Sequence, residues 1–148
     1  MTNYERYDAF TGLTILEKSK LVSFLLENSE NGQFSRQVIT EAVECAIKER
    51  ASLGGFILTL KKEKELLGVI VVNRTSSDRR QKLSLLAIAR SHRHNGVAKK
   101  LVTQAIEKAG SGLSLQIEPG NGEEAFFKKL GFERKYVVLQ ADRDKDGS

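Results

Sequence analysis

Residues 83–101 read Leu83-Ser84-Leu85-Leu86-Ala87-Ile88-Ala89-Arg90-Ser91-His92-Arg93-His94-Asn95-Gly96-Val97-Ala98-Lys99-Lys100-Leu101. The first seven residues form a nearly continuous apolar run, which is typical of a central strand that is covered on both faces. From Val97 to Ala109 apolar residues recur at helical spacing, and Gly110 supplies a helix stop. The stretch therefore predicts a buried strand, a polar loop and the start of an amphipathic helix.

The segments on either side of this stretch predict further helices and strands. Thr14 and Glu17 have the spacing of a capping box for a helix that ends near Asn28, and Ser35 is placed to cap a second helix. A short helix is expected over 123–130. The other expected strands, in chain order, are 4–10, 55–60, 66–72, 113–118 and 132–139.

This order of elements predicts an α/β sandwich with helices on both faces of a mixed sheet. The strand-helix-strand segment over 83–118 should be a right-handed parallel crossover. No internal repeat or composition shift marks a boundary, so we expect one domain over 1–140 and a charged, flexible tail over 141–148.

The composition is that of a globular chain of 148 residues, with 40% hydrophobic and 29% charged residues. No segment resembles a membrane span or a signal peptide, and Cys45 is the single cysteine, so a cytoplasmic protein is expected. Cys45 lies in the apolar stripe of the second helix with Val38, Ala42 and Ala46. The net charge of +5 favours nucleic acid, an acidic protein or a phosphorylated cofactor as partner, or reflects a generally basic surface.

The loop after the central strand has the features of an anion-binding site. A helix N-terminus presents unsatisfied amides and about half a positive elementary charge. Gly96 lets the backbone approach an anion closely, and the small Ala98 keeps that approach open. Arg93, Lys99 and Lys100 add positive charge, and these lysines oppose the helix dipole unless a polyanion is bound. The loop therefore predicts a site for a phosphorylated ligand.

Other ligand motifs do not fit the sequence. Neither Gly-x-x-x-x-Gly-Lys-Ser/Thr nor Gly-x-Gly-x-x-Gly after a strand occurs. His92 and His94 lack a cysteine, histidine or carboxylate partner at zinc-like spacing. We expect His94 to line the anion loop, His92 to face solvent, and no metal to be bound.

The loop resembles the acetyl-CoA-binding motif of the GNAT superfamily, Arg/Gln-x-x-Gly-x-Gly/Ala, at Arg93, Gly96 and Ala98. Downstream, residues 121–132 are similar to the closing helix of that family, whose usual ending is Tyr-x-x-x-Gly-Phe; here Gly131 and Phe132 supply the last two residues. The resemblance covers the chain from about Gly55 onward. It implies a three-layer α/β/α sandwich with a mixed, mostly antiparallel sheet and one parallel crossover.

The resemblance also implies an N-acetyltransferase that uses acetyl-CoA as cosubstrate and a primary amine as acceptor. The Ile88 amide would stabilise the oxyanion that develops at the thioester. Strand backbone groups would bond the pantetheine amides as a neighbouring strand would, and loop amides would hold the pyrophosphate. The residues assigned to the cosubstrate are Leu86, Ala87, Ile88, Arg93, His94, Asn95, Gly96, Val97, Ala98, Lys99, Asn121 and Phe127.

The residues that would move protons are less well defined. Glu118 is the candidate general base because it ends a strand on its polar side, although an ordinary surface carboxylate fits that position too. Phe127 occupies the position where the family commonly has a tyrosine that protonates the leaving thiolate. Asn121 lies one residue closer to that aromatic position than is usual. A thiol of pKa about 8.5 can leave without an acid, and Tyr136 is a substitute donor.

Two other classes of protein fit parts of the sequence. The first is a sensor or partner subunit that binds acyl-CoA without transferring the acyl group. Phe127 favours this class, because phenylalanine cannot donate a proton to the leaving thiolate. A nucleic-acid-binding module fits the net charge and the basic segment 78–82, but aromatic residues that alternate with basic ones are missing. The sequence identifies no particular acceptor, and it leaves the oligomeric state open, a homodimer included.

Overall fold

The computed structural model describes residues 2–29, 34–48, 55–74, 81–93, 95–109, 112–115, 123–134, 139 and 141. They belong to two compact units, Met1–Gln116 and Ile117–Ser148. The elements are β1 (Thr2–Tyr7), α1 (Ile15–Asn28), α2 (Arg36–Ile47), β2 (Phe56–Lys62), β3 (Glu65–Arg74), β4 (Gln81–Ile88), the 3₁₀ helix η2 (Arg90–His92), α3 (Val97–Ala109), β5 (Leu113–Ser114) and α4 (Glu123–Lys129).

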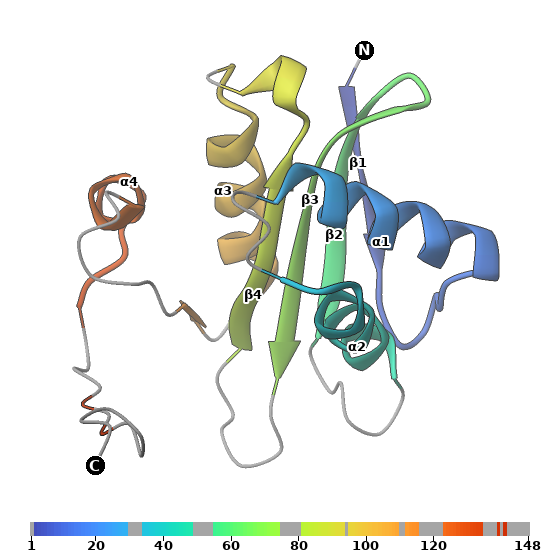
Figure 1. Ribbon diagram of the computed structural model, residues 1–148. Helices are drawn as coiled ribbons and strands as arrows, with labels where there is room; N and C mark the ends of the chain where they lie inside the picture. Colours follow the sequence, from blue (N-terminus) through green and yellow to red (C-terminus); the bar gives the residue numbers. More distant parts are fainter. Residues whose placement is uncertain are drawn as a thin grey trace, which may run out of the picture. The chain divides into compact units, whose positions relative to one another are not determined.

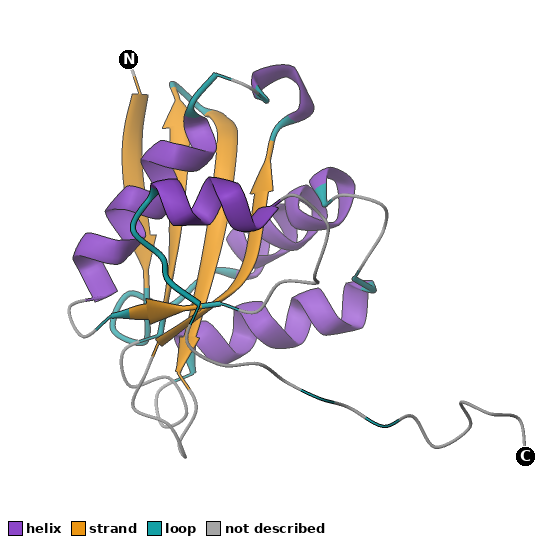
Figure 2. Cartoon of the chain, turned by 90° about the vertical axis from the view of Figure 1, so that its left-hand side faces the viewer, coloured by secondary structure: helices purple, strands orange, loops and turns teal. Residues whose placement is uncertain are grey.

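The first unit is a sheet with helices on both faces. Its strands lie in the order β1-β2-β3-β4-β5; the first four pair antiparallel, and β5 pairs parallel with β4. Helices α1 and α2 pack on each other on one face of the sheet, and α3 packs on β2, β3 and β4 from the other face (Figure 1). Turned by 90°, the unit shows helices on either side of the strands (Figure 2). The expected α/β sandwich with a mixed, mostly antiparallel sheet is confirmed.

Local signals in the sequence set where the first two helices begin. The amide of Glu17 donates to Thr14 Oγ1 at 3.0 Å, and the amide of Thr14 donates to Glu17 Oε1 at 2.9 Å, which completes the predicted capping box. Ser35 caps α2 through a bond from the Val38 amide. The core-facing stripe of α2 differs from the predicted one, because Val38 is 46% exposed while Ile39 is fully buried.

Side chains alternate between the two faces of β3. Val69 and Val71 join the core beneath α1 and α2, whereas Gly68 faces α3. A Cβ atom at Gly68 would lie 2.5 Å from Leu101 Cδ1 and 2.9 Å from Ile88 Cδ1. The missing side chain therefore allows α3 and the end of β4 to approach the middle of the sheet closely.

Several strand boundaries differ from those expected. β1 spans Thr2–Tyr7, and the chain turns at Asp8 because its side chain accepts the amides of Phe10 and Thr11. The described parts of the expected last strand, 132–134 and 139, form no strand, and 135–138 lie outside the described residues. β5 is Leu113–Ser114; residues 116–118 of the strand expected there also lie outside them.

In the second unit, α4 ends as its sequence predicts. Gly131 has a φ of 103°, and its amide donates to the Lys128 carbonyl, while the Phe132 amide donates to the Phe127 carbonyl. These two bonds form a Schellman motif, which a left-handed glycine permits. Phe127 is buried, with its ring edge-on to Phe126 and Phe132.

Candidate functional site

The outer edge of β4 offers backbone groups to a ligand. Among the described residues, β5 pairs with β4 only at Gln81 and Lys82, so β4 has no strand partner on that side from Leu83 onward. The Ala89 amide donates to the Leu67 carbonyl of β3 at 2.8 Å. Because successive residues of a strand direct their backbone groups to opposite edges, Leu86 and Ile88 direct theirs away from β3.

Ala87 lies differently from its two neighbours. It is paired with Val69, so its backbone groups lie on the β3 side, and its side chain is buried in the core beneath α1 and α2. The sequence groups Ala87 with Leu86 and Ile88, but in the structure only these neighbours present N–H and C=O groups at the outer edge of β4.

The N-terminus of α3 supplies the second group of donors. The amide of Lys100 donates to the Gly96 carbonyl at 3.1 Å, so Gly96 immediately precedes the first turn. The amides of Val97, Ala98 and Lys99 have no carbonyl within the helix, as in any first turn. Gly96 has a φ of 78°, and no described atom lies within 4 Å of where its Cβ would be. This open space fits an anion close to the backbone.

Positively charged residues lie at the start of α3 and in the segment before it. The first turn of α3 contains no acidic residue, and Lys99 and Lys100 are exposed. The side chain of Arg93 extends instead to the end of α1, where its Nη2 donates to the Asn28 carbonyl at 2.9 Å. His92 is half-buried, and its Nδ1 lies 2.9 Å from Oγ of the exposed Ser91.

The remaining predicted site residues divide into described and undescribed ones. Asn95 is exposed, and its amide donates to the His92 carbonyl at 3.3 Å. Phe127 belongs to the second unit. His94, Glu118, Asn121 and Tyr136 lie outside the described residues.

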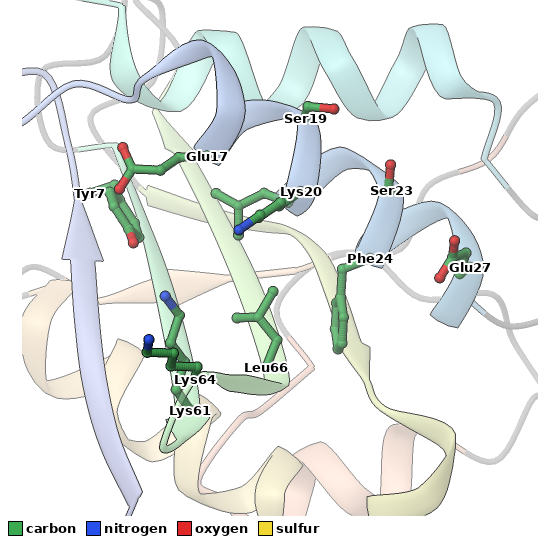
Figure 3. Close-up of a pocket in the computed structure, with 11 residues that line it drawn as sticks. Tyr7, Glu17, Ser19, Lys20, Ser23, Phe24, Glu27, Lys61, Lys64 and Leu66 are labelled. Atoms are coloured by element: carbon green, nitrogen blue, oxygen red, sulfur yellow. The ribbon is translucent and has the colours of Figure 1, made fainter.

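A separate open pocket of about 630 Å³ lies between α1 and the strands β1 to β3. Figure 3 shows its side chains coming from α1 on one side and from the β2–β3 hairpin on the other. Tyr7, Phe24 and Leu66 form part of its lining, with Lys20 and Lys61. The pocket therefore lies beneath α1, over β1 to β3, and the carbonyl of its lining residue Glu27 bonds Arg90, which follows β4.

Beside this pocket, Tyr7 and Glu5 form a bonded pair. The Tyr7 hydroxyl donates to Glu5 Oε2 at 2.7 Å, and Lys61 Nζ lies 3.4 Å from Glu5 Oε1. The Tyr7 hydrogen bond is the largest cause that lowers the pKa of Glu5; burial opposes it, and the charge and hydrogen bond of Lys61 lower the pKa further. Burial, and then the bond to Glu5, raises the pKa of Tyr7.

Replacing Tyr7 by phenylalanine should raise the pKa of Glu5 towards its ordinary value of about 4.3, because the largest cause of the lowering is removed. Glu5 stabilises the fold above its unfolded pKa, and this stability is lost as the pH falls through the lower folded pKa. In Tyr7→Phe, the stability that Glu5 loses as the pH falls should therefore be smaller than in the wild type. Carboxyl carbon NMR titration measures the pKa. Tyr4→Phe, on the same strand, is the control, and an unaltered Glu5 pKa in Tyr7→Phe would contradict the prediction.

Comparison with known proteins identifies the family. The model of the acetyltransferase (GNAT) domain matches residues 21–144. The chain belongs to the GNAT family of acetyltransferases. This confirms the resemblance seen at Arg93, Gly96 and Ala98. No curated protein matches the sequence significantly.

Solved structures of GNAT acetyltransferases share the fold at low sequence identity. An aminoglycoside 6'-N-acetyltransferase from Acinetobacter haemolyticus has a TM-score of 0.69 at 14% identity, over 95% of this chain and 97% of that one. The ribosomal-protein-S18-alanine N-acetyltransferase of Escherichia coli has 0.68 at 12%, over 92% and 80%. A Bacillus subtilis acetyltransferase in complex with CoA has 0.66 at 21%, over 92% and 79%.

Two further observations concern alternative functions. Within the described ranges, no group of three histidine, cysteine or acidic residues could hold a metal ion. No helix in those ranges is long and apolar enough to cross a membrane.

Two residues that shape the site were missed at the sequence level. Arg90 Nη2 donates to the Glu27 carbonyl across a separation of 63 residues, and Gly68 sets how closely α3 approaches β4. The sequence did contain a signal for such a contact. The last turn of α1 has no basic residue to offset the helix dipole, so a cation from another segment, such as Arg90, is favoured there. A glycine within the apolar run 66–72 was a similar signal of close backbone approach.

Proposed function

We propose that this GNAT chain transfers an acetyl group from acetyl-CoA to a primary amine by direct attack of the amine on the thioester. Two sets of backbone donors carry the proposal: Leu86 and Ile88 at the outer edge of β4, which no described strand pairs at these positions, and the first turn of α3 after Gly96. The CoA complex of the Bacillus subtilis neighbour supports the same ligand for this fold.

In this proposal each donor set binds a different part of the cosubstrate. The backbone of Leu86 and Ile88 bonds the pantetheine amides by strand addition. The amides of Val97, Ala98 and Lys99 bind the pyrophosphate, aided by the helix dipole. Bound acetyl-CoA supplies an activated acyl group. The Ile88 amide then stabilises negative charge on the thioester oxygen.

The acceptor amine must lose a proton before it can attack. An amine with a pKa of about 10.4 is almost wholly protonated at pH 7, so a general base is required. Glu118 is our candidate, acting directly or through water. Replacing Glu118 with glutamine should remove a limb of the pH–rate profile while leaving CoA affinity intact. If Glu118 is an ordinary surface carboxylate, the pH–rate profile should stay unchanged.

No acid is assigned to the leaving thiolate. Phe127, at the position of the family's usual tyrosine, carries no proton to donate. The low pKa of a thiol, about 8.5, lets the thiolate leave and take its proton from solvent or from Tyr136. The lone Cys45, half-buried on α2, fits a cytoplasmic protein.

The second candidate function is an acyl-CoA-binding sensor or partner protein, and Phe127 is the residue that favours it. Incubation with acetyl-CoA and pooled primary amines, followed for free thiol and for acetylated amine, tests the enzyme directly. Amine-dependent thiol release is the expected result. Calorimetric binding of CoA without turnover on any amine would favour the sensor.

A further inference from the structure

The C-terminal end of α1 is completed by bonds from outside the helix. The last four carbonyls of a helix have no partner within it. Here the backbone and hydroxyl of Ser29 donate to the carbonyls of Leu25 and Leu26, at 3.0 and 3.3 Å. The carbonyls of Glu27 and Asn28 accept instead from two arginines of the segment between β4 and α3.

These two arginines are Arg90 and Arg93. Arg90 Nη2 lies 3.2 Å from the Glu27 carbonyl oxygen, and Arg93 Nη2 lies 2.9 Å from that of Asn28. The backbone takes part too, because the Arg90 amide donates to Asn28 Oδ1 at 3.3 Å. Three bonds therefore tie the end of α1 to a segment more than 60 residues further along the chain.

The bonded segment is the beginning of the loop that leads to α3. The loop starts after Ala89, whose amide is held by the Leu67 carbonyl, and it ends at Gly96, whose carbonyl accepts from Lys100. Arg90 and Arg93 thus hold the first half of a loop whose far end leads to the first-turn amides of α3. A loop that is ordered before a ligand arrives loses less entropy on binding.

The same contacts have an electrostatic consequence. The C-terminus of a helix carries about half a negative elementary charge, which would repel an anion nearby. The last turn of α1 has no basic residue of its own. The guanidinium groups of Arg90 and Arg93 lie at hydrogen-bond distance from this end and offset its charge.

We infer that Arg90 and Arg93 are positioning residues, which dock the loop before α3 on the C-terminal end of α1 and so prepare it to bind a diphosphate. The inference rests on the proposed function for the identity of the ligand. It differs from direct pairing of Arg93 with phosphate, which the loop sequence suggested. In our account the Arg93 guanidinium affects ligand binding indirectly, through its bond to the Asn28 carbonyl at the end of α1.

Hydrogen exchange on the ligand-free protein tests the docking itself. In Arg90→Met/Arg93→Met, amides of the last turn of α1 and of residues 88–96 should exchange about tenfold faster than in the wild type. The control is Arg36→Met, an exposed arginine at the start of α2, which should leave both segments unchanged. The single variants Arg90→Met and Arg93→Lys extend the test if the double variant does not fold. Unchanged exchange in both segments would overturn the inference.

Titration with CoA then separates positioning from direct contact. Positioning predicts a Kd about tenfold higher in the double variant, accompanied by the faster exchange of the two segments. A flatter dependence of log Kd on ionic strength than in the wild type, with unchanged exchange, would mean that Arg93 pairs with phosphate, and the inference would fail. If wild-type protein does not bind CoA, the proposed function fails, while the exchange experiment still decides the docking.

Discussion

Valine in place of Gly96 should weaken CoA binding by about a hundredfold or more, roughly 3 kcal/mol, while costing the fold only about 1–2 kcal/mol. Gly96 has a φ of 78°, which a β-branched residue does not adopt, so the loop must rearrange. The rearrangement turns the amides of α3 away from the diphosphate, and each hydrogen bond to a charged group contributes about 1.5–3 kcal/mol. The structural cost stays small because the site is open: no described atom lies within 4 Å of the Cβ position.

Gly12 provides the matched control for this substitution. It has a φ of 65°, and its Cβ position is equally open, but it lies in the turn between β1 and α1. Gly12→Val should therefore cost similar stability and leave CoA affinity unchanged. Urea unfolding and isothermal titration calorimetry measure the two quantities. Equal loss of CoA affinity in both variants would mean that Gly96 has no special role at the site.

Valine at position 68 should destabilise the fold by about 2–3 kcal/mol and also weaken CoA binding by about tenfold. The added side chain would overlap Leu101 Cδ1 and Ile88 Cδ1, both fully or largely buried. Relief of this overlap pushes α3 and the end of β4 away from β3. Because these two elements carry the proposed donors, one substitution on the neighbouring strand should alter both sets.

A double-mutant cycle checks the cause. Leu101→Val removes the Cδ1 atom that would lie 2.5 Å from the new Cβ, and alone should cost about 1 kcal/mol. Combined with Gly68→Val, it should recover at least about 1 kcal/mol relative to the sum of the single effects. Additive losses in the free energy of unfolding would show that the contact with Leu101 is not the source of the strain.

Much of the fold could be predicted because its signals are local. The capping box at Thr14 and Glu17 and the left-handed stop at Gly131 depend on residues within one turn of each other, and both form as expected. The apolar run before the loop and the helical spacing after it likewise placed β4 and α3. The glycine of the loop was recognised as a backbone requirement, and its positive φ agrees.

The features that escaped prediction depend on contacts between distant segments. The bond from the Arg93 side chain to the carbonyl of Asn28, 65 residues away, could not be read from the loop motif. The buried face of α2 contains Ile39 instead of the expected Val38. Packing on the sheet, rather than spacing alone, decides which of two adjacent apolar residues is buried. β1 ends at Tyr7 because the Asp8 side chain forms a turn with the amides that follow it.

The most direct test of the account follows backbone amides by ¹⁵N NMR while CoA is added to the wild-type protein. The account predicts saturable shifts in the amides of Val97, Ala98 and Lys99 and in those of Leu86 and Ile88, with Gly12 unaffected. The contradicting result is the absence of these shifts at millimolar CoA, or shifts confined to the pocket beneath α1.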